Sequence, residues 1–332
     1  ASEFAEHMKE ICKAGAKILG GCCGTNPEYI KAVKEAVTKV ESTESEIDKY
    51  ISSERNYLNI SDINYCCIDA GADEDIVQEL EDDEYDTIYD LLDDMEDEEQ
   101  NAVLLRVTGS DDELGTLKTV LTEITGYATY PIIFETENED VLIKIQREYV
   151  ESGSQIVYAP TFGANSIKLR EYGLEDEAVE LNKKLVEISK KAVDGKALVA
   201  GDITMCGQNL IPLGELSLEE LIASYEQQIK AIDDAGADLL VIETMMSLQE
   251  TRAALIAASN VSELPVMVTM TFGDGGKTLY GTDARTAAIV LESLGADAVG
   301  MNCSAGPDKM VELVKQVKEV TNLPVIAKPN AG

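Results

Sequence analysis

The sequence has no tryptophan, a single histidine and few basic residues. Of its 332 residues, 5% are aromatic, and 27 Lys and Arg stand against 63 Asp and Glu, for a formal net charge of −36. Because apolar residues still amount to 45%, the core is predicted to be aliphatic and global disorder is excluded. The lone histidine, His7, lies in a polar stretch, so histidine-based triads and metal sites are not expected.

Other absences narrow the class of protein further. An acidic excess of this size repels phosphate groups, so no nucleic-acid partner is expected. No apolar run approaches the ~18 residues of a membrane span, and nothing at the start resembles a secretion signal. The seven cysteines form no small disulfide framework. These features favour a cytoplasmic protein, without a membrane partner, whose thiols are free or bound to a metal.

Short apolar segments alternate with amphipathic ones along most of the chain. The strand candidates are residues 17–21, 156–159, 197–201, 239–242, 265–270, 298–302 and 324–327. Between a helix and the next strand stand Gly15, Gly236 and Gly295, which are expected to end the helices in the left-handed backbone conformation. About eight such units predict an α/β fold, a (β/α)8 TIM barrel. A doubly wound open sheet is the alternative, but no G-x-G-x-x-G turn follows a strand.

The stretch between the first helices and the remaining barrel units differs in composition. Between Asp69 and Gln100 it holds seventeen acidic residues and no Lys or Arg, while apolar residues recur at helical spacing. Such a run is typical of a solvated helix face, with a docking surface for a basic partner or adaptation to high salt as alternatives. We predict an acidic α/β module at residues 39–146, and a barrel made of residues 1–38 and 147–332.

Two adjacent cysteines, Cys22 and Cys23, follow the first strand between glycines. Neighbouring side chains of a strand point to opposite faces, so both thiols can face one ion only if the chain bends, which the glycines permit. Cys303 ends another strand. Three thiolates from two strand ends would suit a zinc ion with an open coordination position. On spacing alone, burial of three small apolar side chains is slightly favoured, because adjacent cysteines are an uncommon zinc spacing.

The other cysteines make weaker candidates. Cys66 and Cys67 lack flanking glycines and are expected to be buried in a strand. Cys206 follows a strand end, which would place it near the site, and Cys12 is expected in the core side of a helix.

Two motifs together resemble those of a known family. The stretch Gly-Gly-Cys-Cys-Gly-Thr-Asn-Pro-Glu (residues 20–28) and the Asn-Cys-Ser turn (302–304) are similar to the zinc motifs of the homocysteine S-methyltransferase family, which includes the homocysteine-binding domain of cobalamin-dependent methionine synthase. Further strand ends agree, at residues 159–166, 201–203, 242–244, 269–272 and 328–332. The resemblance covers roughly residues 1–38 and 147–332.

The resemblance implies a zinc centre. Cys22, Cys23 and Cys303 would be the metal ligands and would act in catalysis through zinc, and Asn330 would supply an oxygen ligand when substrate is absent. A free thiol with a pKa near ~8.5 is mostly protonated at neutral pH, whereas zinc would keep the substrate sulfur deprotonated and nucleophilic.

The resemblance also implies the reaction, which is transfer of a methyl group to the thiol of L-homocysteine, giving methionine. Glu243 would hold the substrate ammonium. Asp202 and Asn165 are further substrate-binding candidates, with ordinary hydrogen bonding at a strand end as the alternative. The donor is expected to be methylcobalamin on a corrinoid protein or partner domain, with a small sulfonium or quaternary ammonium compound as another option. The alternative function is a non-catalytic zinc-binding barrel that docks a corrinoid or other partner protein.

The order of the motifs departs from the family. The double-cysteine strand comes first instead of last, and the family's opening strand with its Asp-Gly-x-x-Gly-Thr turn is missing. We interpret the chain as a circular permutation with the acidic module inserted; reordered or incomplete pieces would give the same order. The strand at 131–135 and the helix at 138–152 are expected to replace the missing unit. The module also faintly resembles the opening of the folate-binding barrel of methionine synthase, without recognisable pterin-binding residues.

Overall fold

The chain divides into two compact units. We call Ala1–Tyr57 with Gln146–Gly332 the barrel unit, and Leu58–Ile145 the acidic unit. Helix α6 (Glu139–Glu151) begins in the acidic unit and ends in the barrel unit. The structure is a computed structural model that describes residues 1–21, 25–38, 65–82, 84–95, 98, 100, 102–110, 112–127, 132–135, 138–273, 275–303 and 306–329.

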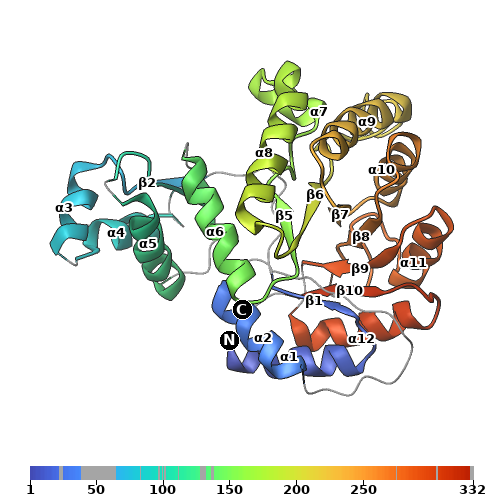
Figure 1. Ribbon diagram of the computed structural model, residues 1–332, viewed down its shortest axis with the longest axis horizontal. Coiled ribbons are helices and arrows are strands. Elements are labelled where there is room, and N and C mark those ends of the chain that lie inside the picture. The colour runs from blue at the N-terminus through green and yellow to red at the C-terminus, as the bar shows by residue number, and fades with distance from the viewer. Residues whose placement is uncertain are drawn as a thin grey trace. The chain divides into compact units, whose positions relative to one another are not determined.

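A curled sheet of seven parallel strands forms the centre of the barrel unit (Figure 1). Its strand order is β1-β10-β9-β8-β7-β6-β5. The strands are β1 (Ile18–Leu19), β5 (Ile156–Ala159), β6 (Leu198–Ile203), β7 (Leu239–Met245), β8 (Val266–Met270), β9 (Ala298–Asn302) and β10 (Val325–Lys328). The predicted α/β barrel-type fold is confirmed, although the described part of the chain contributes seven strands to this sheet where eight were expected.

Helices cover the outer face of this sheet (Figure 1). They are α1 (Ser2–Lys13), α2 (Pro27–Val37), α7 (Ser166–Leu169), α8 (Ala178–Val193), α9 (Leu218–Asp234), α10 (Leu248–Val261), α11 (Ala284–Ser293) and α12 (Pro307–Lys318). The turns after α1, α9 and α11 contain Gly15, Gly236 and Gly295 with φ of 108°, 85° and 92°, so the predicted left-handed glycines are confirmed. Across the described residues, none of the helices is long and apolar enough to span a bilayer.

The inner face of the sheet changes from apolar to polar along the strands. One cluster of its apolar residues comprises Ile18, Ala200, Leu239, Val241, Met267, Ala298 and Ile326. Alternate residues of a strand face the same side, and toward the carboxyl ends the inner positions become polar, on β9 after Gly300. We call these the inner polar layer: Asp202, Glu243, Thr269, Asn302 and Lys328, each at most 7% exposed.

Strands β1 and β5 are the two edges of the sheet, and no pairing between them is found in the described residues. The Leu198 N–H donates to the Gln155 carbonyl, so the carbonyl of Tyr158, three residues on, faces away from β6. Gln146 of α6 donates from Nε2 to this Tyr158 oxygen at 3.0 Å. The glutamine therefore satisfies an edge carbonyl that a neighbouring strand would otherwise bond.

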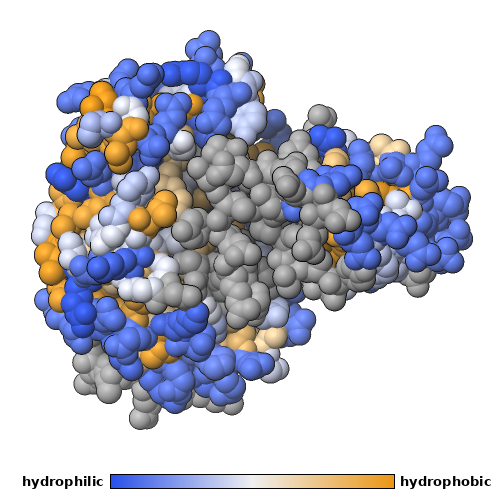
Figure 2. Space-filling model, turned by 180° about the vertical axis from the view of Figure 1, so that it is seen from behind, coloured by the Kyte–Doolittle hydropathy of each residue, from blue (hydrophilic) through white to orange (hydrophobic). Residues whose placement is uncertain are grey.

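The acidic unit contains a second parallel sheet, of order β2-β3-β4. Its elements are β2 (Tyr65–Asp69), α3 (Glu74–Asp82), α4 (Asp86–Asp93), β3 (Ala102–Arg106), α5 (Glu113–Tyr127) and β4 (Ile132–Glu135). Ile76, Ile88, Leu92 and Met95 are buried in its core, which leaves the acidic positions of the helices facing solvent. On the face that Figure 2 shows, the described surface of this unit is mostly hydrophilic. The prediction of a solvated acidic helix face is confirmed.

The expected substitute for the missing barrel strand was wrong. Strand β4 pairs with β3, from Val103 opposite Ile132 to Arg106 opposite Glu135, and so belongs to the sheet of the acidic unit. It is the terminal strand of that three-stranded sheet, and β3 is its neighbour there. Only the end of α6 contributes to the barrel unit.

Candidate active site

Cys303 follows the last residue of β9 and is held by its neighbour Asn302. The fully buried Asn302 donates from Nδ2 to Cys303 Sγ at 3.3 Å and to Thr244 Oγ1 at 2.7 Å. Its Oδ1 accepts the Thr244 N–H at 3.0 Å. Cys303 and Thr244 both have left-handed backbone, with φ of 60° and 57°, which is uncommon outside glycine and rarer for a β-branched residue. Such strained positions cluster at functional sites, and here Asn302 joins two of them.

The carboxyl end of the first strand, β1, lies on the same side of the sheet as the carboxyl end of β9. Leu19 is aligned with Ala327, which is aligned with Met301, so β1 and β9 are separated by β10 alone. Parallel strands in such a sheet present their carboxyl ends at one face, where barrel enzymes place their chemistry.

The predicted partners of Cys303 in a zinc site lie outside the described residues; these are Cys22, Cys23 and Asn330. Among the residues that the structure describes, no group of three His, Cys, Asp or Glu side chains could hold a metal ion. The half-buried thiol of Cys303 at a strand end, hydrogen-bonded by an amide, has the soft donor and the outer hydrogen bond that zinc ligands carry. The one candidate ligand that the structure describes is therefore of a donor type that zinc binds.

Glu243, the expected partner of a substrate ammonium, is paired with an ammonium of the chain itself. Its carboxylate contacts Lys328 Nζ across the interior of the sheet, with side-chain exposures of 10% for Glu243 and 2% for Lys328. The Lys328 ammonium also lies 4.7 Å from the ring centroid of Tyr158. Its charge is thus balanced by a carboxylate and by an aromatic face.

Asp202 and Asn165 have different positions. Asp202 lies in the inner polar layer with Glu243, and its backbone exchanges two hydrogen bonds with the Thr161 hydroxyl, at 2.8 and 2.9 Å. Asn165 lies in the loop after β5 and caps α7 by accepting the Lys168 N–H at 2.9 Å. Its Nδ2 atom is buried and has no hydrogen-bond partner in the described part of the chain. Asp202 is therefore brought together with Glu243, whereas Asn165 serves as a helix cap.

Sequence reasoning missed Lys328 and Tyr158, and it did not assign a role to Asn302. A signal for Lys328 was present, because it ends the apolar strand Val325–Lys328 two residues after the inward-facing Ile326. A lysine at an inward position of a buried strand is rarely fully buried unless it has a partner. Glu243, the partner of Lys328, lies three strands away in the sheet. No local sequence pattern predicts that these two residues meet.

The remaining cysteines lie in cores or on the surface. Cys66 is buried in β2, but Cys67 is exposed, so its expected burial was wrong: successive residues of a strand face opposite sides. Cys12 is buried in α1, as expected. Cys206 is fully buried in the core between the sheet and the helices, away from the inner polar layer.

A buried carboxylate holds the loop that contains Cys206. Glu250 Oε1 accepts the Cys206 N–H at 2.6 Å and the Tyr225 hydroxyl at 3.0 Å. Burial raises the pKa of Glu250, despite these hydrogen bonds. Burial, and then the Glu250 charge, raise the pKa of the Cys206 thiol to about 12.

We expect Cys206 to be inert toward iodoacetamide in the folded protein. With a pKa of about 12, roughly one thiol in 10⁴ is ionised at pH 8, and only the thiolate reacts. Peptide mass spectrometry after labelling at pH 8 should find Cys67 modified and Cys206 unmodified until denaturant is added. Equal labelling of both in the native protein would contradict this placement of Cys206.

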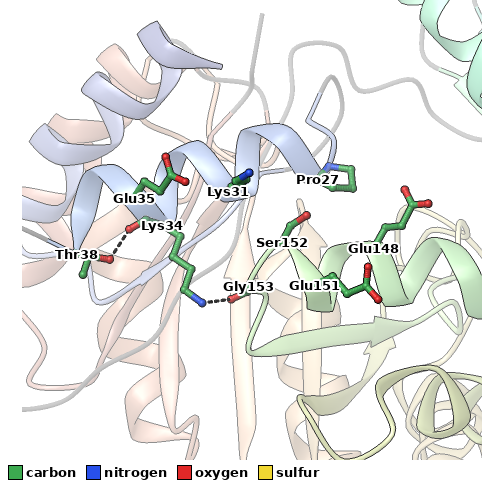
Figure 3. A pocket seen from close by; sticks show the side chains of 9 residues that line it. All are labelled: Pro27, Lys31, Lys34, Glu35, Thr38, Glu148, Glu151, Ser152 and Gly153. Atoms are coloured by element: carbon green, nitrogen blue, oxygen red, sulfur yellow. Dashed lines mark hydrogen bonds between the residues drawn. The ribbon is translucent and has the colours of Figure 1, made fainter.

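A solvent-open groove of about 780 Å³ lies between α2 and the end of α6 (Figure 3). Lys34 extends across it and donates from Nζ to the Gly153 carbonyl at 3.4 Å. Its other charged lining residues are Lys31, Glu35, Glu148 and Glu151. The groove lies in the helix layer, outside the inner polar layer, and its mixed charges favour no single class of ligand.

Comparison with known proteins agrees with the resemblance in sequence. The model of a family described as homocysteine S-methyltransferase matches residues 1–37 and 109–332. The chain is 29% identical over 211 residues to the methionine synthases of Mycobacterium leprae and Mycobacterium tuberculosis. These matches cover 60% of this chain but only 17% and 18% of the two relatives.

Solved structures support the fold. The metallated form of the homocysteine methyltransferase MmuM from Escherichia coli matches with a TM-score of 0.53 and 22% identity, over 71% of this chain and 85% of that one. Its oxidised form matches with a TM-score of 0.53 and 23% identity, over 59% of this chain and 73% of that one. At this level of identity, the likeness concerns the barrel-type architecture.

Proposed function

Because the chain belongs to the homocysteine S-methyltransferase family, we propose that it catalyses zinc-dependent transfer of a methyl group to the thiol of L-homocysteine, giving methionine. The observation that carries the proposal is the position of Cys303, whose thiol is oriented by Asn302 at the end of β9. The carboxyl end of β9 lies on the same side of the sheet as the carboxyl end of β1. The Cys22-Cys23 pair follows β1 in the sequence.

Cys22, Cys23 and Cys303 would hold the zinc ion, and Asn330 would complete the set in the absence of substrate. When bound, zinc would lower the pKa of a coordinating thiol, so that the substrate sulfur would be a thiolate at neutral pH. The hydrogen bond from Asn302 would fix the rotamer of Cys303 and would withdraw some negative charge from its sulfur.

The chain's own residues would bind and orient the amino acid. Glu243 and Asp202, both in the inner polar layer, supply carboxylates for the substrate ammonium. The sulfur electron pair forms the new carbon–sulfur bond, while the bond between methyl and donor breaks and its electron pair leaves with the donor. No general base is needed for the thiolate, which agrees with a chain that contains a single histidine.

We propose a methyl-corrinoid protein or domain as the donor. The similarity to methionine synthases supports it, and the match spans less than a fifth of their length. The described residues include several large apolar side chains that are exposed in the loops after β6 and β8, among them Ile211, Leu213 and Tyr280. A donor protein would meet the barrel at this end of the strands.

A second candidate is a zinc-binding barrel that docks a partner without catalysing transfer. The missing Asp-Gly-x-x-Gly-Thr turn favours it, because the sequence then lacks one of the family's motifs at the first strand. Calorimetry of zinc-loaded protein with L-homocysteine separates the two functions. Binding heat supports the enzyme, and its absence supports the docking protein.

Replacing Cys303 with serine should abolish stoichiometric zinc and methyl transfer together. The hydroxyl is a poorer zinc donor than a thiolate, and loss of a ligand should exceed the roughly 10- to 100-fold loss typical of outer-sphere changes. Metal content by mass spectrometry, and transfer from methylcobalamin to homocysteine, measure the two effects.

The matched control for this experiment is Cys67→Ser, which changes an exposed thiol in the acidic unit. It should retain about one zinc per chain and full activity. Full zinc content in Cys303→Ser would refute the assignment of this residue as a ligand.

A further inference from the structure

We propose that Lys328 is the residue that recognises the substrate carboxylate, and that Lys328 and Glu243 together form a clamp for the two charges of an α-amino acid. The inference rests on the proposed function, because it specifies how the same site selects its thiol substrate. Lys328 on β10 would take the carboxylate, and Glu243 on β7 the ammonium. The side chain that carries the thiol would then be directed toward Cys303.

The first argument is the environment of the pair. Both side chains face the interior at the carboxyl ends of their strands and are at most 10% exposed. An isolated buried ion pair is seldom needed for stability, because a well-packed apolar pair often serves as well. A buried pair at the end of a barrel that holds catalytic sites is therefore better explained by a charged ligand. A zwitterion can insert between the two charges without leaving either of them unpaired.

The second argument comes from nearby hydroxyls. Thr269 and Thr271 on and after β8 are 0% and 2% exposed, and their Oγ1 atoms have no hydrogen-bond partner among the described residues. Buried hydroxyls normally have a hydrogen-bond partner, so these two groups are available to hydrogen-bond a polar ligand. Thr269 belongs to the inner polar layer and lies on β8, the neighbour of β7, which carries Glu243.

The third argument is the balance of charge. Asp202 and Glu243 bring two carboxylates to the inner polar layer, and Lys328 brings one ammonium. A ligand with one ammonium and one carboxylate would pair with both kinds of charge. Its ammonium would face the two carboxylates, and its carboxylate would face the Lys328 ammonium. A thiol that lacks either group would leave one buried charge without its partner, which is a strong basis for discrimination.

Three thiols test the clamp by calorimetry on the zinc-loaded full chain. They are L-homocysteine, aminopropanethiol, which lacks the carboxylate, and mercaptobutyrate, which lacks the ammonium. The wild type should bind homocysteine more tightly than either analogue by roughly 10- to 100-fold, as expected for a charge-assisted hydrogen bond. In Lys328→Gln, the advantage of homocysteine over aminopropanethiol should vanish, while its advantage over mercaptobutyrate remains. Glu243→Gln should show the opposite pattern.

Two further variants separate recognition from folding. Lys328→Arg keeps the charge and should restore much of the preference for the carboxylate. Lys230→Gln removes an exposed lysine of α9 and should leave all three affinities unchanged.

The outcomes distinguish the inference from the proposed function. If the wild type binds homocysteine and Lys328→Gln keeps its full preference over aminopropanethiol, the clamp is wrong and the proposed function stands. If Lys328→Gln weakens homocysteine and aminopropanethiol equally, Lys328 acts only through structure, and the clamp is again wrong. If the wild type binds none of the thiols, the proposed function fails and the clamp with it.

Discussion

Replacing Lys328 with methionine is expected to lower the free energy of unfolding by about 3–5 kcal/mol. Methionine keeps most of the volume of the side chain but removes the ammonium that contacts Glu243. The Glu243 carboxylate then stays in an interior that is almost closed to water, with no cation beside it. Urea denaturation at pH 7, followed by far-ultraviolet circular dichroism, measures the loss.

A double variant shows whether this loss comes from the stranded charge. Lys328→Met combined with Glu243→Gln removes both charges, so it should recover a large part of the stability lost in the single variant. The exposed pair Lys230–Asp234 is the control, and Lys230→Met should leave stability nearly unchanged. A change below about 1 kcal/mol in Lys328→Met would mean that water reaches Glu243 and that the pair is not buried in solution.

Replacing Gly300 with alanine is expected to destabilise the barrel unit by more than about 4 kcal/mol, or to prevent its folding. A Cβ atom at this position would overlap the Ile326 carbonyl oxygen and would lie 2.7 Å from the Ile326 Cα. These are backbone atoms of β10, which cannot turn aside as a side chain can. The two strands would have to separate, and β9 carries Asn302 and Cys303 at its end.

The same denaturation experiment, with zinc content as a second readout, tests this prediction. Gly275→Ala is the matched control, because nothing lies within 4 Å of its added Cβ and its φ is not in the left-handed region. It should change the free energy of unfolding by less than about 0.5 kcal/mol. A stable Gly300→Ala protein with full zinc would show that β9 and β10 can move apart without harm to the site.

The strands of the barrel unit were predictable because their signal is local. Continuous apolar segments such as 239–242 and 298–302 became β7 and β9 with bounds shifted by at most three residues. The family was also predictable, since the paired cysteines and the Asn-Cys-Ser turn are contiguous motifs, and the family match includes both.

Strand β4 shows the limit of this reasoning. Its sequence has the apolar character of a barrel strand, and it precedes a helix that leads into β5, so its position in the chain favoured the barrel. A strand joins whichever sheet offers a matching hydrogen-bonding edge, and β3 offers that edge. Which of the two sheets a strand joins depends on neighbours that are distant in sequence. The apolar periodicity within the strand therefore cannot predict it.

The aliphatic α/β architecture, the family and the residues with thiol and carboxylate chemistry could be predicted from the sequence. Each of these depends on composition or on short contiguous patterns. The contact of Glu243 with Lys328, and the hydrogen bonds by which Asn302 joins Thr244 to Cys303, are visible only in the folded chain. Glu243 and Lys328 are 85 positions apart in the chain, and Thr244 and Asn302 are 58 positions apart. These contacts arise because curling of a parallel sheet brings the inward residues of separate strands together, and no local pattern in the sequence specifies which charges then meet.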